Sequence, residues 1–290
     1  MRVAESSVTP SPQLNSGRIA QAFTRCDLEG SRALIAFLTA GDPSPDRTVS
    51  LIGALERGGS DIIELGVPFS DPIADGPVIQ RASERALRSG TTVRKVLRIV
   101  EELRRTSQIP VVAFSYLNPV LRYGFERFAA DAASVGVDGA LLTDLNIEEA
   151  AGYVSEMNAS GLDCVFLVTQ TTPQERIARI AGHCGGFVYA VSRAGVTGVR
   201  SSIASDAVPL LRRTRRATSL PVAIGFGLSQ RRHMEEVAPF AEGAVVGSAF
   251  VRLIEEHSRD ESLEARLEAL AREFKRGLDW SPASDAAVGR

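Results

Sequence analysis

Glu64 is an ionisable residue inside an apolar run, residues 61–65, close to the carboxyl end of that run. Burying a carboxylate without a partner costs several kcal/mol, so this one needs a catalytic purpose or a basic partner. In a dry site its pKa should rise. Asp71 and Asp75 follow in the next loop. Loop aspartates are usually turn formers, and spacing alone does not decide which of the two would work with Glu64 in acid–base chemistry.

Two glycine turns form a second candidate cluster near the end of the chain. Gly225-Phe226-Gly227 follows the apolar run 222–224, and Gly247-Ser248 follows the run 243–246. Glycine lets a backbone approach a ligand closely, and the N–H groups at a helix N-terminus bind anions. Together the two turns indicate a phosphate site. The small, glycine-hinged segment 192–202 is typical of a mobile lid, although an ordinary surface loop fits it as well.

Short apolar runs alternate with helical patterns along the chain, which predicts a parallel α/β sheet. We expect strands over 33–38, 61–65, 111–115, 139–143, 164–168, 187–191, 222–224 and 243–246. We expect helices over 48–57, 93–105, 125–135, 147–159, 173–181, 203–216 and 263–274. Eight strands can close into a (β/α)8 TIM barrel, where active sites lie at the carboxyl ends of the strands.

The barrel is expected to be a single domain, residues 17–275, between a disordered leader (1–16) and a flexible tail (276–290). An open doubly wound sheet is the alternative architecture. The first predicted strand is not followed by the Gly-x-Gly-x-x-Gly turn of a dinucleotide-binding sheet, which favours the barrel.

Composition narrows the class of function. The net charge of the 290-residue chain is −2, which argues against nucleic acid as a partner. We expect neither a membrane span nor a metal site, because no apolar run is long enough and the three histidines lack ligand spacing. Three cysteines without a Cys-x-x-Cys pair fit the reducing cytoplasm. No lysine ends a predicted strand, which disfavours a Schiff-base aldolase.

Five motifs give the chain a resemblance to a known family. Residues 64–77 read Glu-Leu-Gly-Val-Pro-Phe-Ser-Asp-Pro-Ile-Ala-Asp-Gly-Pro, and the other four motifs are residues 37–43, 192–198, 225–228 and 245–249. In order and spacing they closely resemble the tryptophan synthase alpha chain family. The resemblance implies a (β/α)8-barrel lyase that cleaves indole-3-glycerol phosphate to indole and glyceraldehyde 3-phosphate in tryptophan biosynthesis.

The same resemblance assigns expected roles to individual residues. It implies that Glu64 is the general acid/base and Asp75 its catalytic partner, with Thr197 engaging Asp75 when the lid closes. Substrate-binding roles are implied for eight positions: Phe37, Tyr189, Thr197, Gly198, Phe226, Gly227, Gly247 and Ser248. Phe37 would line the indole pocket, and the positions from Gly198 onward would contact the phosphate.

The resemblance also implies a partner. This chain would need no cofactor, because pyridoxal phosphate is expected only in a tryptophan synthase beta chain, with which it would form an alpha2beta2 heterotetramer. Two alternatives stay open. One is a stand-alone indole-3-glycerol phosphate lyase that releases free indole, and the other is a non-catalytic regulatory homologue.

Overall fold

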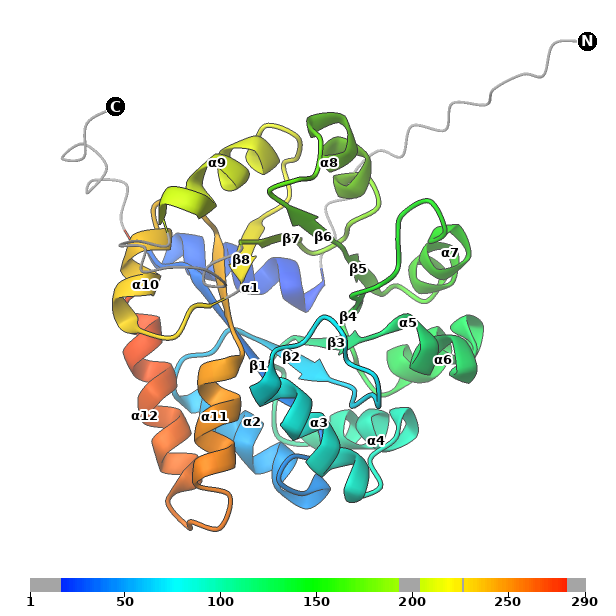
Figure 1. The fold of residues 1–290 in the computed structure, drawn as a ribbon, viewed down its shortest axis with the longest axis vertical. Helices are drawn as coiled ribbons and strands as arrows, with labels where there is room; N and C mark the ends of the chain where they lie inside the picture. The colour runs from blue at the N-terminus through cyan, green and yellow to red at the C-terminus, as the bar shows by residue number, and fades with distance from the viewer. Residues whose placement is uncertain (1–16, 193–203, 226, 281–290) are drawn as a thin grey trace, which may run out of the picture.

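The fold is a barrel of parallel strands. The computed structural model describes residues 17–192, 204–225 and 227–280. Within them the strands pair in the order β5-β4-β3-β2-β1-β9-β8-β7-β6, with every pair parallel (Figure 1). They are β1 (Ala33–Thr39), β2 (Ile62–Gly66), β3 (Val111–Ser115), β4 (Gly139–Leu142), β5 (Asp163–Val165), β6 (Leu167–Thr169), β7 (Val188–Val191), β8 (Val222–Gly225) and β9 (Gly243–Val246). The predicted TIM barrel is confirmed.

The strand expected over 164–168 is divided in two at Phe166. Its first half, β5, pairs with β4, and its second half, β6, pairs with β7. The halves therefore lie at opposite ends of the strand order but are joined by one residue. The Phe166 carbonyl still accepts a hydrogen bond from Tyr189 N (3.2 Å), so the break is a bend that closes the barrel.

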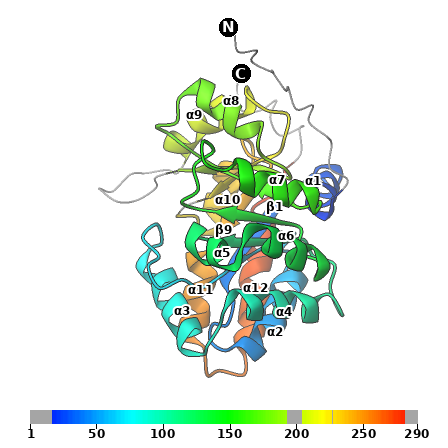
Figure 2. The same ribbon diagram turned by 90° about the vertical axis from the view of Figure 1, so that its right-hand side faces the viewer.

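Helices surround the sheet in a ring, except the first, which lies across one end of the barrel (Figures 1 and 2). They are α1 (Arg18–Leu28), α2 (Thr48–Arg57), α3 (Pro77–Arg88), α4 (Val93–Leu103), α5 (Leu117–Tyr123), α6 (Phe125–Ser134), α7 (Ala151–Ala159), α8 (Gln174–Ala181), α9 (Ala204–Arg215), α10 (Arg231–Val237), α11 (Ser248–Glu256) and α12 (Leu263–Arg276). The sequence pattern does not predict α3, because its buried residues are the small Ala82, Ser83 and Ala86. The helix expected over 147–159 begins only at Ala151. None of the helices described is long and apolar enough to cross a bilayer.

Alternation along each strand separates an inner from an outer face. In β2, Ile63 and Leu65 pack outward against the helices, whereas Ile62 joins the cluster that fills the barrel. Successive side chains of a strand point to opposite faces, so Glu64 points inward, as Ile62 does. The strand register places the one carboxylate of β2 inside the barrel.

Helix α1 closes the amino-terminal end of the barrel. Its apolar residues, including Ile19 and Phe23, belong to the same cluster as the interior residues of the strands. The ring centroids of Phe23 and Phe187 lie 5.7 Å apart. In Figures 1 and 2, α1 (blue) lies at the end opposite the loop between β2 and α3 (cyan).

Residues 276–280 correct the expected flexible tail, because they pack onto the barrel. The Leu278 side chain is fully buried, and its carbonyl accepts a hydrogen bond from Arg32 N (2.9 Å). The Arg32 guanidinium lies 3.7 Å from the centre of the Trp280 ring. The polar composition of the last fifteen residues hid these two apolar anchors. Residues 281–290 and the predicted leader 1–16 lie outside the described residues.

The packing of Leu278 predicts a measurable loss of stability. Leu278→Ala should lower the free energy of unfolding by about 2–5 kcal/mol, because it leaves a cavity in a fully buried site. Leu28→Ala is the matched control, since that leucine is 84% exposed and should cost little. Urea denaturation of both variants gives the comparison. Equal midpoints would contradict the docking of this segment.

Candidate active site

Glu64 lies at the mouth of the barrel with its side chain almost fully buried. The register pairs it with Phe37 of β1 and Val112 of β3, and only 1% of its surface is exposed. Among the described residues its Oε1 atom has no hydrogen-bond partner. Burial alone raises the pKa of Glu64 to about 8. The expected rise is confirmed, and Glu64 is a neutral acid at pH 7.

The structure separates the two loop aspartates. Asp71 is exposed and accepts a hydrogen bond from the Ser70 hydroxyl (2.5 Å), as a turn former does. Asp75 is half-buried, and desolvation raises its pKa to about 6, while a hydrogen bond from Tyr116 opposes the rise. The buried member of the pair is therefore Asp75, which sequence spacing alone left undecided.

Tyr116 holds the Asp75 loop. In the sequence it is only a lone tyrosine after the third predicted strand, so no pattern predicts this role. Its hydroxyl accepts a hydrogen bond from Ala74 N (3.0 Å) and donates one to the Asp75 carboxylate. Its ring lies 5.3 Å from that of Phe69. Burial and the neighbouring Asp75 raise the pKa of Tyr116, so the phenol keeps its proton and stays a donor.

Tyr189 brings the two carboxyl groups into one site. It rises from β7 into the barrel interior, and its pKa is raised by burial and by the nearby charges of Glu64 and Asp75. A side chain at position 225 would collide with the Tyr189 hydroxyl, so Gly225 on β8 leaves room for the phenol. The expected site residues Glu64, Asp75 and Tyr189 therefore lie together.

Phe37 forms an aromatic wall beside Glu64. Its ring packs over Gly66, where a Cβ atom would come within 2.8 Å of it, and an edge-to-face contact with Phe114 brings the ring centroids to 5.2 Å. Gly247 lies on another side of the same ring. The Glu64 carboxyl group, beside Phe37 in the neighbouring strand, can therefore reach a flat aromatic substrate that packs against the Phe37 ring.

The two glycine turns lie at the carboxyl ends of β8 and β9. Gly227 has φ +80°, a conformation that favours glycine. Gly247 precedes the first residue of α11, Ser248, and no side chain caps this N-terminus. The first-turn N–H groups of α11 are therefore open to an anion. Thr197, Gly198 and Phe226, and most of the expected lid over 192–202, lie outside the described residues.

The comparisons with known proteins agree with one another. The family of tryptophan synthase alpha chains matches residues 23–279. The chain is 55% identical over 261 residues to the tryptophan synthase alpha chain of Solibacter usitatus, covering 90% of this chain and 98% of that relative. The chain belongs to the tryptophan synthase alpha chain family. The alpha chain of Geotalea uraniireducens is 47% identical, with coverage of 90% and 97%.

Solved structures of this family share the barrel. A tryptophan synthase alpha subunit from Legionella pneumophila superposes with a TM-score of 0.84 at 35% identity, covering 91% of this chain and 98% of that one. A chain of Mycobacterium tuberculosis tryptophan synthase gives a TM-score of 0.83 at 38% identity, with coverage of 91% and 99%.

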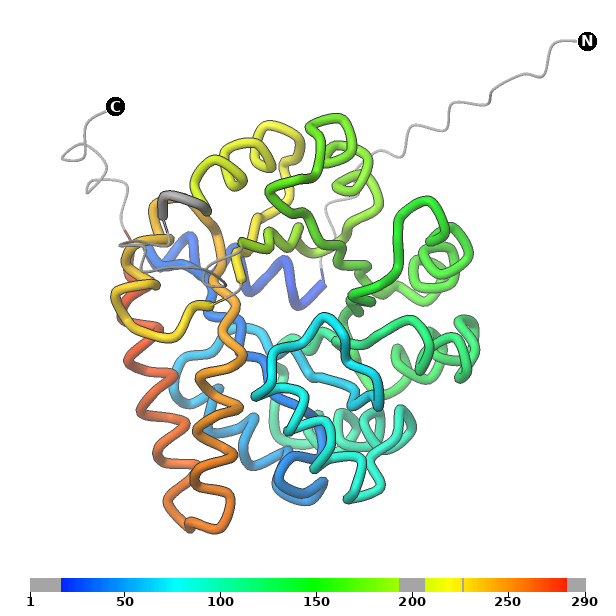
Figure 3. The backbone as a smooth tube through the Cα atoms, viewed as in Figure 1, coloured from blue at the N-terminus to red at the C-terminus, as the bar shows by residue number. Residues whose placement is uncertain are grey.

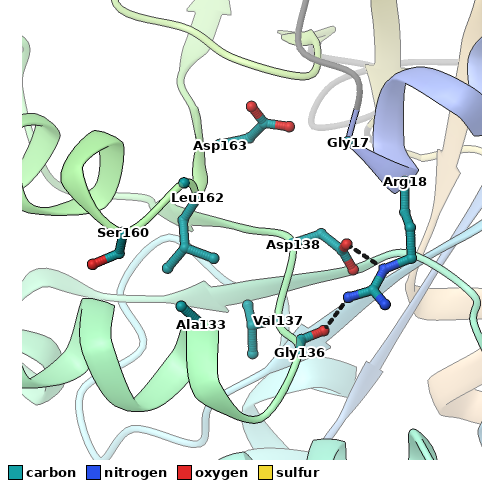
Figure 4. Close-up of a pocket in the computed structure, with 10 residues that line it drawn as sticks. Gly17, Arg18, Ala133, Gly136, Val137, Asp138, Ser160, Leu162 and Asp163 are labelled. Atoms are coloured by element: carbon teal, nitrogen blue, oxygen red, sulfur yellow. Dashed lines mark hydrogen bonds and ion pairs between the residues drawn. The ribbon is translucent and has the colours of Figure 1, made fainter.

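A surface cavity of about 310 Å³ lies elsewhere on this alpha chain, at the amino-terminal end of the barrel. Its lining includes Arg18 and Asp138, which form an ion pair at 2.6 Å, and Arg18 also donates to the Gly136 carbonyl at 2.8 Å (Figure 4). Arg104 pairs with the second Asp138 oxygen at 3.0 Å. The cavity lies next to α1, at the far end from Glu64, and the charges of Asp138 are neutralised there. It does not contribute to the candidate active site.

Metal ligation has no basis in the part of the chain that the structure describes, since no three His, Cys, Asp or Glu side chains gather there. The chemistry of the described site rests on carboxyl and phenol groups.

The raised pKa of Glu64 makes a prediction about stability. Its folded pKa of about 8 lies above the ordinary 4.5, so the folded chain keeps a proton that the unfolded chain releases. The contribution of Glu64 to the free energy of unfolding is therefore greatest below pH 4.5 and is lost as the pH rises through 8. Glu64→Gln, which cannot ionise, should raise Tm above that of the unmutated chain at pH 8.

Differential scanning calorimetry at pH 5 and pH 8 measures this difference. The gain in Tm should be several degrees at pH 8 and much smaller at pH 5, because little of the penalty is present there. Asp71→Asn, on an exposed carboxylate, should show no such gain. A gain of the same size at both pH values would rule out the ionisation of Glu64 as its cause.

Proposed function

We propose that this chain cleaves indole-3-glycerol phosphate by a retro-aldol reaction, as the alpha subunit of tryptophan synthase. The observation that carries the proposal is the buried, proton-bearing Glu64 beside Asp75 and Tyr189, in a chain of this family. A retro-aldol cleavage of this substrate needs one proton moved from a hydroxyl to a carbon. It needs neither a metal nor an organic cofactor.

Glu64 moves that proton. In its acid form it protonates indole C3, and the carboxylate that remains takes the proton of the glycerol hydroxyl next to the breaking bond. The electrons of the carbon–carbon bond return to the indole ring as the aldehyde forms, and Glu64 ends as the acid it was. A pKa of about 8 leaves Glu64 protonated at neutral pH, ready for the first step.

Asp75 accepts a hydrogen bond from the indole N–H, which stabilises positive charge on the ring once C3 is protonated. It must be ionised to do so, and its pKa of about 6 allows this at neutral pH. The hydrogen bond from Tyr116 supports the ionised form. Thr197 engages Asp75 when the lid closes. The two carboxyl groups therefore differ in protonation between about pH 6 and pH 8.

The remaining positions bind the substrate. Phe37 and Tyr189 line the indole pocket, which is supported by their packing beside Glu64. Gly198, Phe226, Gly227, Gly247 and Ser248 contact the phosphate. The uncapped N-terminus of α11 supports this role, because its N–H groups and helix dipole favour an anion.

The rim around the barrel mouth is the surface for the beta chain, and two chains of each kind form an alpha2beta2 heterotetramer. Two large apolar side chains are exposed there, Ile73 (86%) after β2 and Leu121 (54%) on α5. The hydrogen bond between Ala74 N and Tyr116 joins their two loops. Pyridoxal phosphate is carried by the beta chain. The cytoplasm is the compartment, in keeping with three free cysteines in this chain.

Site-directed variants test the reaction. Glu64→Gln should reduce indole release from indole-3-glycerol phosphate by about 10²-fold or more, and Asp75→Asn by a comparable factor. Asp71→Asn, measured in the isolated chain, should retain activity, because the Asp71 side chain is exposed and hydrogen-bonds to Ser70. Indole is followed by its absorbance. Full activity of Glu64→Gln would remove the proposed mechanism. Failure of the unmutated chain to release indole even when paired with a beta chain would favour the regulatory homologue.

Mixing with a tryptophan synthase beta chain tests the partner. We expect a complex of alpha2beta2 mass by light scattering and faster indole release than from the chain alone. Ile73→Asp or Leu121→Asp should weaken the complex about tenfold or more, since each puts a charge into an apolar contact. Leu28→Asp, at the opposite end of the barrel, is the control. A chain that is fully active alone and forms no complex would be the stand-alone lyase.

A further inference from the structure

A network of ion pairs lies beside the candidate active site without touching it. The Asp42 side chain, 1% exposed, forms a two-pronged pair with Arg85: Nε to Oδ1 at 2.7 Å and Nη2 to Oδ2 at 2.9 Å. The third arm of the guanidinium, Nη1, reaches Glu255 Oε1 at 2.7 Å. Arg81, one turn earlier on the same helix, also holds Glu255, with Nε and Nη2 each at 2.7 Å, but it is Arg85 that joins Glu255 to Asp42. Every nitrogen of the Arg85 fork is therefore used. Such a planar fork fixes direction as well as distance.

The three residues come from three elements around the candidate site. Two of these elements adjoin the Asp75 loop and the proposed phosphate site. Asp42 lies in the loop after β1, Arg85 in α3 and Glu255 in α11. Helix α3 begins at Pro77, two residues after Asp75, and α11 begins at Ser248, at the proposed phosphate site. Figure 3 shows the loop after β2 (cyan) running into α3, which lies beside α11 (orange).

The same three elements also meet in an apolar contact one helical turn closer to the site. Phe37 of β1, Ala82 of α3 and Val251 of α11 form a separate hydrophobic cluster. Arg85 follows Ala82 by three residues, and Glu255 follows Val251 by four, so each charged residue lies on the same helix face as its apolar neighbour. A small apolar contact alone would let α3 and α11 slide past each other, whereas a forked ion pair resists such a shift.

We propose that Arg85 is a positioning residue that fixes the separation between Asp75 and the N-terminus of α11. Asp42 anchors the guanidinium to the barrel, and Glu255 anchors α11 to the guanidinium. A substrate with an indole at one end and a phosphate at the other is then held by both ends in one geometry. This inference rests on the proposed function, because it assigns the two ends of the site to two parts of one substrate.

The alternative is a purely structural ion pair. Product fragments distinguish the two, since indole occupies only the Asp75 end and glyceraldehyde 3-phosphate only the α11 end. A change in separation leaves each fragment bound as before but misaligns the joined substrate. Misplacement by about 1 Å can cost about 10²-fold in rate.

The experiment compares Arg85→Met with Arg88→Met. Both arginines lie in the last turn of α3, but Arg88 is exposed and forms its ion pair with Glu84 on its own helix. For Arg85→Met we expect kcat/KM for indole-3-glycerol phosphate to fall about tenfold or more, while the inhibition constants of indole and of glyceraldehyde 3-phosphate each change less than about twofold. Arg85→Lys, which keeps the charge but loses the fork, should recover only part of the loss.

Three results would overturn the positioning role. The first is an Arg85→Met variant as active as Arg88→Met, and the second is a parallel loss of affinity for both fragments, which would show local collapse. Hydrogen exchange at the Gln80 amide, bonded to the Gly76 carbonyl at 3.0 Å, reads the same role without the reaction. We expect faster exchange in Arg85→Met only, and unchanged exchange, the third result, would overturn the role. An unmutated chain that releases no indole even when paired with a beta chain would instead refute the proposed function.

Discussion

The site depends on keeping one carboxyl group out of water without a charged partner. Glu64 lies on the inner face of β2, as Ile62 does, among the apolar residues that fill the barrel. Its pKa rises to about 8 because of this burial alone. A lysine or arginine within reach would cancel the effect by favouring the ionised form. The inner face around Glu64 therefore has to be apolar, and α1 has to cover the far end of the barrel.

That constraint explains why the second carboxyl group comes from a loop. Asp75 lies on the rim, half-exposed, with a phenol donor from Tyr116 that favours ionisation. Its pKa of about 6 stays below neutrality, whereas that of Glu64 stays above it. Two residues of similar chemistry thus hold opposite protonation states at pH 7, because one is on a buried strand and the other is on a loop held by a hydrogen-bond donor.

The barrel and the candidate role of Glu64 could be predicted from the pattern of residues in the sequence, whereas the roles of Asp75 and Tyr116 could not, and each outcome has a physical cause. Buried parallel strands are continuous apolar runs, and a carboxylate inside one is conspicuous. Asp71 and Asp75 are equivalent in spacing, and only the fold shows which one is covered. Tyr116 carries no pattern at all, since its role comes from an adjacent loop 42 residues away in the chain. The bend at Phe166 and the docking of Leu278 likewise depend on tertiary contacts that no local pattern contains.

Acidic residues are paired with basic groups at the amino-terminal end of the barrel, whereas Glu64 at the mouth is paired with none in the described part of the chain. At the amino-terminal end, Asp61 accepts hydrogen bonds from Leu34 N (2.9 Å), Lys275 (2.7 Å) and Arg25 (2.9 Å), and Asp138 is paired with two arginines. A buried carboxylate satisfied in this way stabilises one arrangement of the elements around it. At the mouth, the Glu64 Oε1 atom has no hydrogen-bond partner among the described residues. Burial raises the pKa of Glu64 to about 8, close enough to neutrality for the proton to be given up and taken back during a reaction. The paired carboxylates at the amino-terminal end can hold the surrounding elements in place because the proposed reaction does not use them. The open end can carry an unpaired acid because the closed end and the Asp42–Arg85–Glu255 network hold the frame around it.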